Sequence, residues 1–208
     1  MEMIDPLGEC LQLIVPVFEE LEILYYIGGS VATFTHGNRR QTNDVDIVAD
    51  IREEHILQLS ERLGAFFLVD DQMIKRSLRY GSSFNLIHLK SIYKVDIFPL
   101  KTRPYDHEAA SRRQRELVEG EPSVEAFVAS PEDVVLAKLE WFVATNKTSE
   151  KQWNDITGVL KTQCFTIDLD YLQHWANEIG VTNLLDKALD ESGITELTEE
   201  TESNGDSD

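Results

Sequence analysis

Residues 25–50 read YYIGGSVATFTHGNRRQTNDVDIVAD, and this stretch decides the fold. The apolar residues 23–27 predict a strand that ends at Gly28-Gly29-Ser30, and the helix-compatible segment VATFTH follows until Gly37, a residue typical of helix C-termini. The glycine turn is therefore expected to open a helix. Backbone N–H groups and the helix dipole attract phosphate at such a turn, and glycine lets a phosphate approach without a Cβ in the way.

Two carboxylates follow on one predicted strand. In the run DVDIV at residues 44–48, alternation places Asp44 and Asp46 on one face and Val45 and Ile47 on the other. Like charges held so close repel each other unless a cation lies between them. Because hard carboxylate oxygens beside phosphates suit Mg²⁺, or Mn²⁺ in its place, the sequence predicts a divalent metal here.

A third carboxylate, Asp96, lies in a near copy of the same pattern. The segment YKVDIF at 93–98 repeats the Val-Asp-Ile tripeptide of residues 45–47. If the two strands lie side by side, three carboxylates converge. A two-metal site for phosphoryl or nucleotidyl transfer, with metals roughly 4 Å apart, requires such a set of acids.

These motifs resemble a known superfamily. A Gly-Gly-Ser turn, thirteen further residues, Asp-Val-Asp and a separate strand aspartate are similar to the nucleotidyltransferases of polymerase-beta type. Within that superfamily, the pattern Arg40-x-Thr42-x-Asp44-x-Asp46 and the later helical block resemble the toxin-like AbiEii and MenT branch, bacterial proteins often encoded beside an antitoxin. The resemblance covers about residues 20–160.

The resemblance implies roles for individual residues. Lys138 matches a lysine on the first helix of the family's C-terminal part, and Asp155 matches an aspartate on the next helix; both act near the phosphates or the nucleophile. Asn154 departs from the pattern, because an arginine often precedes that aspartate. The implied catalytic and metal-binding set is Asp44, Asp46 and Asp96, and the implied nucleotide-binding set is Gly28, Gly29, Ser30, Arg40, Thr42, Lys138 and Asp155.

Each motif also has a purely structural explanation. A Gly-Gly-Ser turn and an Asp-x-Asp strand end occur in proteins without a nucleotide. Lys138 lies among apolar residues and could extend from a buried helix face to solvent. Asp155 could be a surface cap or ion-pair partner. Arg39 and Arg40 either bind phosphate or balance the charges of nearby aspartates.

Composition limits the class of protein. With 208 residues, 42% of them hydrophobic, the chain can bury a normal core, in one domain or a core with a small appendage. No apolar run approaches the roughly 20 residues of a membrane span, and residues 1–10 lack the features of a signal peptide. We expect a cytoplasmic protein without a membrane partner, in which Cys10 and Cys164 are buried thiols.

The net charge is −19, and residues 190–208 hold eight acidic side chains and no basic one, so the other residues still carry −11. An acidic surface disfavours non-specific binding to nucleic acid, and no DNA partner is expected. Two basic clusters could bind a substrate or merely balance nearby acids on helix surfaces. They comprise Lys75, Arg76 and Arg79, and Lys101, Arg103, Arg112, Arg113 and Arg115.

Periodicity predicts an α/β fold, a mixed sheet flanked by helices, with a C-terminal helical subdomain. The expected domains are a core at 1–130, a helical subdomain at 131–189 and a disordered acidic tail at 190–208. Ser130 as N-cap and Pro131 as first helical residue mark the junction. Expected strands are 23–28, 44–49, 64–69, 83–89, 92–98 and 124–130, and expected helices are 6–20, 52–62, 107–116, 131–145, 149–161, 168–179 and 181–190.

The sequence and the resemblance together predict a Mg²⁺-dependent nucleotidyltransferase that moves a nucleoside monophosphate from an NTP to an acceptor hydroxyl. The resemblance favours RNA as acceptor, a toxin role and a cognate antitoxin as partner. The acidic composition suits a small molecule, such as an antibiotic hydroxyl, or a protein side chain. A catalytically silent module of the same fold, which binds nucleotide or antitoxin, is the competing hypothesis.

Overall fold

The computed structural model describes residues 6–37, 42 and 44–194, and the chain divides into two compact units. The first unit comprises Met1–Thr35 and Arg40–Ala129, and the second comprises His36–Arg39 and Ser130–Asp208. A short segment near residue 36 therefore belongs with the C-terminal helices, although it lies early in the sequence.

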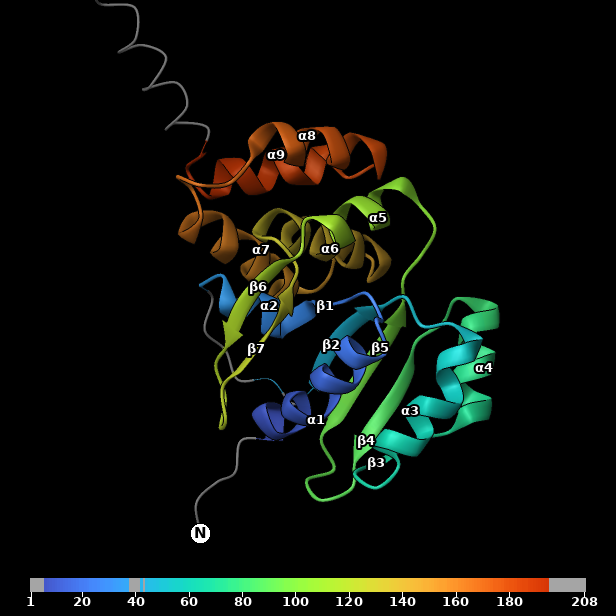
Figure 1. The fold of residues 1–208 in the computed structure, drawn as a ribbon. Coiled ribbons are helices and arrows are strands. Elements are labelled where there is room, and N and C mark those ends of the chain that lie inside the picture. Colours follow the sequence, from blue (N-terminus) through green and yellow to red (C-terminus); the bar gives the residue numbers. More distant parts are fainter. Residues whose placement is uncertain (1–5, 38–41, 43, 195–208) are drawn as a thin grey trace, which may run out of the picture. The chain divides into compact units, whose positions relative to one another are not determined.

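A mixed sheet forms the centre of the first unit (Figure 1). Within the described residues it has seven strands in the order β3-β4-β5-β2-β1-β7-β6. The strands β2 and β5 are parallel, as are β1 and β7, and the other neighbours are antiparallel. Their bounds are β1 (Tyr25–Ile27), β2 (Asp44–Ala49), β3 (Phe67–Leu68), β4 (Phe84–His88), β5 (Lys94–Pro99), β6 (Gln114–Val118) and β7 (Val124–Val128).

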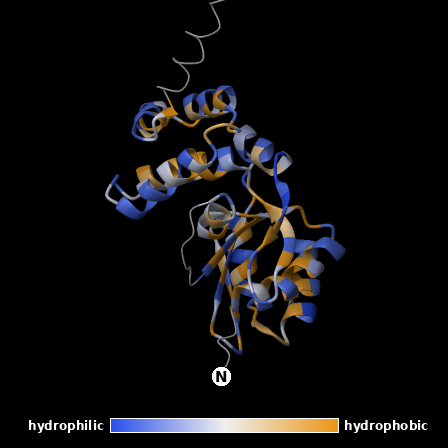
Figure 2. Ribbon diagram, turned by 90° about the vertical axis from the view of Figure 1, so that its left-hand side faces the viewer, coloured by the Kyte–Doolittle hydropathy of each residue, from blue (hydrophilic) through white to orange (hydrophobic). Residues whose placement is uncertain are grey.

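The first unit also contains helices, and both the sheet and the helices contribute buried apolar residues. Alternation along β2 buries Val45, Ile47 and Ala49 completely, and α1 buries Leu11 and Ile14 among others, as the expected helix at 6–20 predicted. Figure 2 shows apolar residues along much of the sheet. The helix bounds are α1 (Pro6–Glu20), α2 (Gly29–Thr35), the short 3₁₀ helix η1 (Glu53–His55), α3 (Ile56–Leu63), α4 (Asp71–Tyr80) and α5 (Pro104–Ser111).

The second unit is helical from residue 131 onward. Its helices are α6 (Pro131–Ala144), α7 (Glu150–Thr162), α8 (Leu169–Glu178) and α9 (Thr182–Glu191). The Ser130 hydroxyl accepts from the backbone N–H of Asp133 at 3.2 Å, and Pro131 is the first helical residue, which confirms the predicted start of α6. The helix α6 packs against α7 and α8, and α9 packs against the same two helices.

Residues 36–37 pack on the end of α7 within the second unit. Gln163 Nε2 donates to the carbonyl of His36 at 3.1 Å. Gly37 has φ +119°, and a Cβ added there would lie 2.8 Å from Cβ of Thr162. The position therefore requires glycine both for its backbone conformation and for the close approach of Thr162.

The helix α4 was not among the expected elements. Its residues are mostly polar, and only Ile74 and Ser77 are buried, so the helix contributes few core residues even though its apolar side chains are segregated on one side. Two end signals are present nevertheless. The Asp70 carboxylate accepts from the backbone N–H groups of Gln72 and Met73, and Gly81 ends the helix with φ +64°.

Two expected elements were wrong in extent. The helix expected at 107–116 ends at Ser111, and residues 114–118 form β6, which pairs with β7. The first three residues of β6 are polar, which resembles a helix surface, but pairing with a neighbouring strand decides the structure. The strand expected at 64–69 shrinks to Phe67–Leu68, since the backbone N–H of Gly64 bonds to Ser60 at the end of α3.

The α/β class with a C-terminal helical part is confirmed. Among the described residues, every helix is too short or too polar to cross a lipid bilayer. Cys10 is buried as expected, whereas Cys164 is only partly buried, and the two form no disulfide. The helix α9 continues to Glu191 and Ile194 is buried, so these residues belong to the helical unit, while residues 195–208 of the expected tail lie outside the described residues.

Candidate functional site

The predicted carboxylates lie on one face of two adjacent parallel strands. In the register of β2 and β5, Asp46 is opposite Asp96 and Asp44 is opposite Lys94. Because residues two apart on a strand share a face, the three acids occupy neighbouring positions, and the apolar pairs Val45–Val95 and Ile47–Ile97 are buried on the other face. The repeated Val-Asp-Ile tripeptide therefore predicted this arrangement correctly.

Asp96 is the most enclosed of the three acids. Its Oδ1 accepts from Asn85 Nδ2 at 2.6 Å, and its Oδ2 accepts from Lys94 Nζ at 2.8 Å. Asn85 lies on β4 directly opposite Asp96. Both oxygens of this carboxylate are thus engaged by neighbours on the same face of the sheet.

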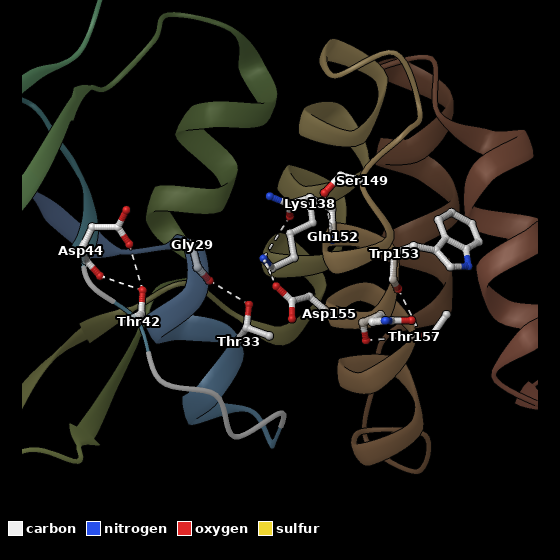
Figure 3. A network of polar contacts seen from close by, with 11 residues as sticks. Gly29, Thr33, Thr42, Asp44, Lys138, Ser149, Gln152, Trp153, Asp155 and Thr157 are labelled. Carbon is white, nitrogen blue, oxygen red and sulfur yellow. Dashed lines mark hydrogen bonds and ion pairs between the residues drawn. The ribbon is translucent and has the colours of Figure 1, made fainter.

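The glycine turn lies directly beside this face. The N–H of Gly28 donates to the backbone oxygen of Asp46 at 2.9 Å, and the oxygen of Gly28 accepts from Ala32 in the first turn of α2. The Thr33 hydroxyl donates to the oxygen of Gly29 at 2.8 Å (Figure 3). The turn predicted after the first strand is therefore fixed both to β2 and to the helix that it opens.

The two glycines of the turn are required for different reasons. Gly29 has φ +55°, and a Cβ there would lie 2.7 Å from Cγ of Asp46, so the fold itself demands glycine. Gly28 has an ordinary backbone conformation, and a Cβ added to it would meet no described atom within 4 Å. Neither backbone strain nor packing explains Gly28, and the space above it is open to a ligand.

Thr42 supports the first acid. Its hydroxyl is 2.9 Å from Oδ1 of Asp44 and 3.1 Å from the backbone oxygen of the same residue (Figure 3). Ser30 is the second residue of α2 and is partly buried. Arg39 and Arg40, the predicted phosphate or balancing arginines, lie outside the described residues.

The donor chemistry of Asp44 and Asp46 fits a divalent ion. Mg²⁺ is commonly bound by one or two carboxylates together with substrate phosphates, and Gly29 leaves room for the Asp46 carboxylate beside the turn. In the described part of the chain, however, no group of three His, Cys, Asp or Glu side chains is arranged to hold a metal. A role for Asp96 as the third metal ligand therefore stays a prediction.

Lys138 and Asp155, which the sequence analysis placed on successive helices, form an ion pair inside the second unit. Lys138 Nζ on α6 lies 2.9 Å from Asp155 Oδ2 on α7 and donates to Gln152 Oε1 at 3.2 Å (Figure 3). Both charged side chains are almost fully buried. Lys138 therefore does not extend to solvent, and Asp155 is not a surface cap.

The basic clusters are partly used within the first unit. Arg103 forms a two-point ion pair with Asp106, and Arg115 pairs with Glu19 at 3.1 Å and Glu125 at 3.5 Å. The carboxylate of Glu19 raises the pKa of Arg115. For these two arginines the structure favours charge balance over a free substrate-binding strip.

An open cavity of about 680 Å³ in the first unit lies away from the acids. It begins where β2 and β5 end, whereas Asp44 is the first residue of β2. Its lining residues are Ile51, Arg52, Glu53, Lys75, Leu78, Arg79, Pro99 and Leu100.

Three polar residues that contact Asp96 or Lys138 were not predicted. Lys94 and Asn85 contact Asp96, and Gln152 contacts Lys138. A signal existed for Lys94, because it precedes Asp96 by two residues on the same strand and must share its face. The others depend on contacts between elements, which a single sequence does not display.

No protein-family model matches the sequence, and no curated protein sequence matches it. Among solved structures, the chain is similar to an antigenic nucleotidyltransferase-like protein from Paracoccidioides brasiliensis, with TM-score 0.52 and 19% identity over 88% of this chain and 92% of that one. It is also similar to the lincosamide antibiotic adenylyltransferase LnuA bound to lincomycin, at TM-score 0.46 and 16% identity over 73% of this chain and 94% of that one. The first likeness shows that this chain has a nucleotidyltransferase-like α/β fold.

Proposed function

We propose that the protein is a divalent-metal-dependent nucleotidyltransferase. The observation that carries the proposal is the arrangement of Asp44, Asp46 and Asp96 on one face of β2 and β5, beside the turn at Gly28 and Gly29. A fold alone does not fix a function. Here the fold is accompanied by acids, an open glycine position and a helix start, which is the chemistry that a triphosphate and its cation need.

In the proposed reaction the acceptor hydroxyl oxygen attacks the α-phosphorus of an NTP. The new O–P bond forms while the bond from that phosphorus to the bridging oxygen of the β-phosphate breaks, and pyrophosphate leaves. Asp96, on the nucleophile side, accepts the hydroxyl proton. The turn at Gly28, Gly29 and Ser30 orients the triphosphate. The Asp44 carboxylate accepts a hydrogen bond from Thr42 and would bind the divalent ion together with Asp46.

Mg²⁺ held by Asp44 and Asp46 would neutralise phosphate charge and polarise the α-phosphate. On the strength of the family resemblance we also assign nucleotide-side roles to Arg40, Thr42, Lys138 and Asp155. Lys138 and Asp155 already engage each other in a buried ion pair, so their nucleotide-side role rests on the resemblance alone.

RNA is the acceptor that the resemblance to the AbiEii and MenT branch favours. In that case the protein would act as the toxin of a toxin–antitoxin pair, with an antitoxin protein as its partner. Transfer to RNA requires cationic contacts to phosphates, which Lys101, Arg112 or Arg113 would have to supply.

A small-molecule acceptor is the second candidate. It is favoured by the net charge of −19 and by the ion pairs of Arg103 and Arg115, which leave fewer cations for a nucleic-acid backbone. A hydroxylated small molecule needs no extended basic surface.

The experiment that tests the function is an incubation with each α-labelled NTP and Mg²⁺ or Mn²⁺. Separate reactions contain total RNA, the protein alone, or a panel of hydroxylated small molecules. Label on RNA supports the toxin reading, whereas label on a small molecule or on the protein retains nucleotidyl transfer and rejects that reading.

Asp44→Asn should abolish any labelling. The matched control is Asp50→Asn, six residues later, which should retain it. If no acceptor is labelled but NTP still binds, the protein is a silent nucleotide-binding module. If folded protein binds no NTP with either metal, the proposed function is wrong.

A further inference from the structure

Four charged side chains form a compact array on one face of the sheet. Asp44 lies opposite Lys94, and Asp46 lies opposite Asp96, in the parallel register of β2 and β5. Alternation along each strand places all four on the same face. The array therefore contains three carboxylates and one ammonium group, with a formal charge of −2.

The ammonium of Lys94 already balances Asp96. The Nζ to Oδ2 distance is 2.8 Å, and Asn85 occupies the other carboxylate oxygen at 2.6 Å. The Asp96 side chain is 13% exposed, while that of Lys94 is 49% exposed and reaches solvent. A largely buried carboxylate needs hydrogen bonds or a counter-charge, and both are present without a metal.

We propose that Lys94 is the permanent cation on the nucleophile side of the site and takes the place of a second metal ion. The chain then binds one divalent ion with the NTP, at Asp44 and Asp46. This inference rests on the proposed function. A second divalent ion at Asp96 would first have to displace the Lys94 ammonium from Oδ2.

The ammonium group can perform part of the task of the second metal. It has three N–H donors, of which one contacts Asp96, and the others can hold the acceptor oxygen and stabilise the negative charge that develops on it. Asp96 keeps lone pairs that can accept the hydroxyl proton. Lys94 therefore orients the nucleophile and Asp96 together.

The test counts metal ions on the full chain. Mn²⁺ is titrated by electron paramagnetic resonance in the presence of an NTP analogue with a methylene group between the α- and β-phosphates, for each of the four bases. We expect one bound Mn²⁺ per wild-type chain. Lys94→Met should bind a second Mn²⁺, because Asp96 then lacks its cation, and Lys94→Arg should bind one.

Lys90→Met is the matched control, since Lys90 forms a solvent-exposed ion pair with Glu9 at 2.7 Å and its loss changes the net charge equally. This control should bind one Mn²⁺. Two Mn²⁺ ions per wild-type chain, a count that needs no variant to fold, would overturn the inference, as would one ion in folded Lys94→Met. Absence of any bound Mn²⁺ and analogue would instead reject the nucleotidyltransferase function itself.

Discussion

Lys138 Nζ on α6 lies 2.9 Å from Asp155 Oδ2 on α7, inside the helical unit, and both side chains are almost completely buried. Gln152 supplies a second acceptor for the same ammonium. Lys138 on α6 thus contacts two residues of α7, Asp155 and Gln152, and these contacts fix the packing of α6 on α7.

Removing one partner of this pair should destabilise the protein strongly. We expect Lys138→Met to lower the free energy of unfolding by about 3–5 kcal/mol, because it leaves the Asp155 charge buried without compensation. Lys138→Met combined with Asp155→Leu should recover much of the loss. Urea unfolding monitored by circular dichroism measures both. A loss below about 1 kcal/mol in the single variant would show that the charge reaches water.

The two glycines of the phosphate turn should respond differently to alanine. Gly29→Ala forces a left-handed residue with a Cβ against the Asp46 carboxylate, and a loss of about 1–3 kcal/mol in unfolding free energy is expected. Gly28→Ala, its matched control, should fold with wild-type stability, since its Cβ meets no described atom. Calorimetry of NTP binding should then show weaker binding in Gly28→Ala. Wild-type affinity there would mean that no ligand approaches Gly28.

Mg²⁺ and NTP should stabilise the protein together. At millimolar nucleotide and a micromolar dissociation constant, mass action gives roughly 4 kcal/mol, which is visible as a rise in melting temperature. Asp44→Asn should lose this shift, and Asp50→Asn should keep it, because Asp50 lies beyond the end of β2 in an ion pair with Arg52. An equal shift in all three proteins would place the nucleotide elsewhere.

Asp96→Asn should affect turnover far more than binding. Asp44 and Asp46 remain to hold the metal, so we expect KM to change only a few-fold while kcat falls by roughly 100-fold or more, the pattern of an interaction used in the transition state. Asp106→Asn is a suitable control, because Asp106 is as enclosed as Asp96 but pairs with Arg103. Full activity in Asp96→Asn would make Asp96 a structural acid.

Tyr25 should make the protein sensitive to alkaline pH. Burial raises the pKa of Tyr25 from 10.0 to about 12, helped by the Glu19 carboxylate beside its hydroxyl. Between pH 10 and 12 the folded state keeps the Tyr25 proton that the unfolded state releases. The contribution of Tyr25 to the unfolding free energy is therefore complete below pH 10 and is lost as the pH rises to 12.

Tyr25→Phe should therefore lose less unfolding free energy than wild type over that pH range, by on the order of 1–3 kcal/mol. Tyr80→Phe, at an exposed position, should behave like wild type. The measurement is denaturant unfolding at a series of pH values. Parallel curves for all three proteins would contradict a proton held by Tyr25.

The sequence predicted that the three acids share one face of the sheet, because the signal for that placement is local. Alternation within 44–48 and the repeated tripeptide at 95–97 determine which side chains share a face. The partners of Asp96 could not be found in the same way. Asn85 reaches Asp96 only through the register of β4 on β5, and that register depends on the packing of the whole sheet.

The missed elements have a similar explanation. The helix α4 carries clear end residues, Asp70 and Gly81, and its few apolar side chains are segregated on one side, so its signals were local although it buries little. The segment 114–118 begins with three polar residues, as a helix surface can, yet its pairing with β7 makes it a strand. Caps would have found the first, whereas the second depends on tertiary pairing.

The helical unit is formed by two separate stretches of the chain, since His36 and Gly37 pack on Thr162 and Gln163. A single cut after Ala129 cannot release the helical unit whole, because a piece of it would remain attached behind α2. Recombination that exchanges only the C-terminal half with a related gene would place a foreign helix end against Gly37. A successful exchange therefore requires that residues 36–37 and the end of α7 come from the same gene. Because residues 36–37 directly follow α2, we expect α2 and α7 to be inherited together.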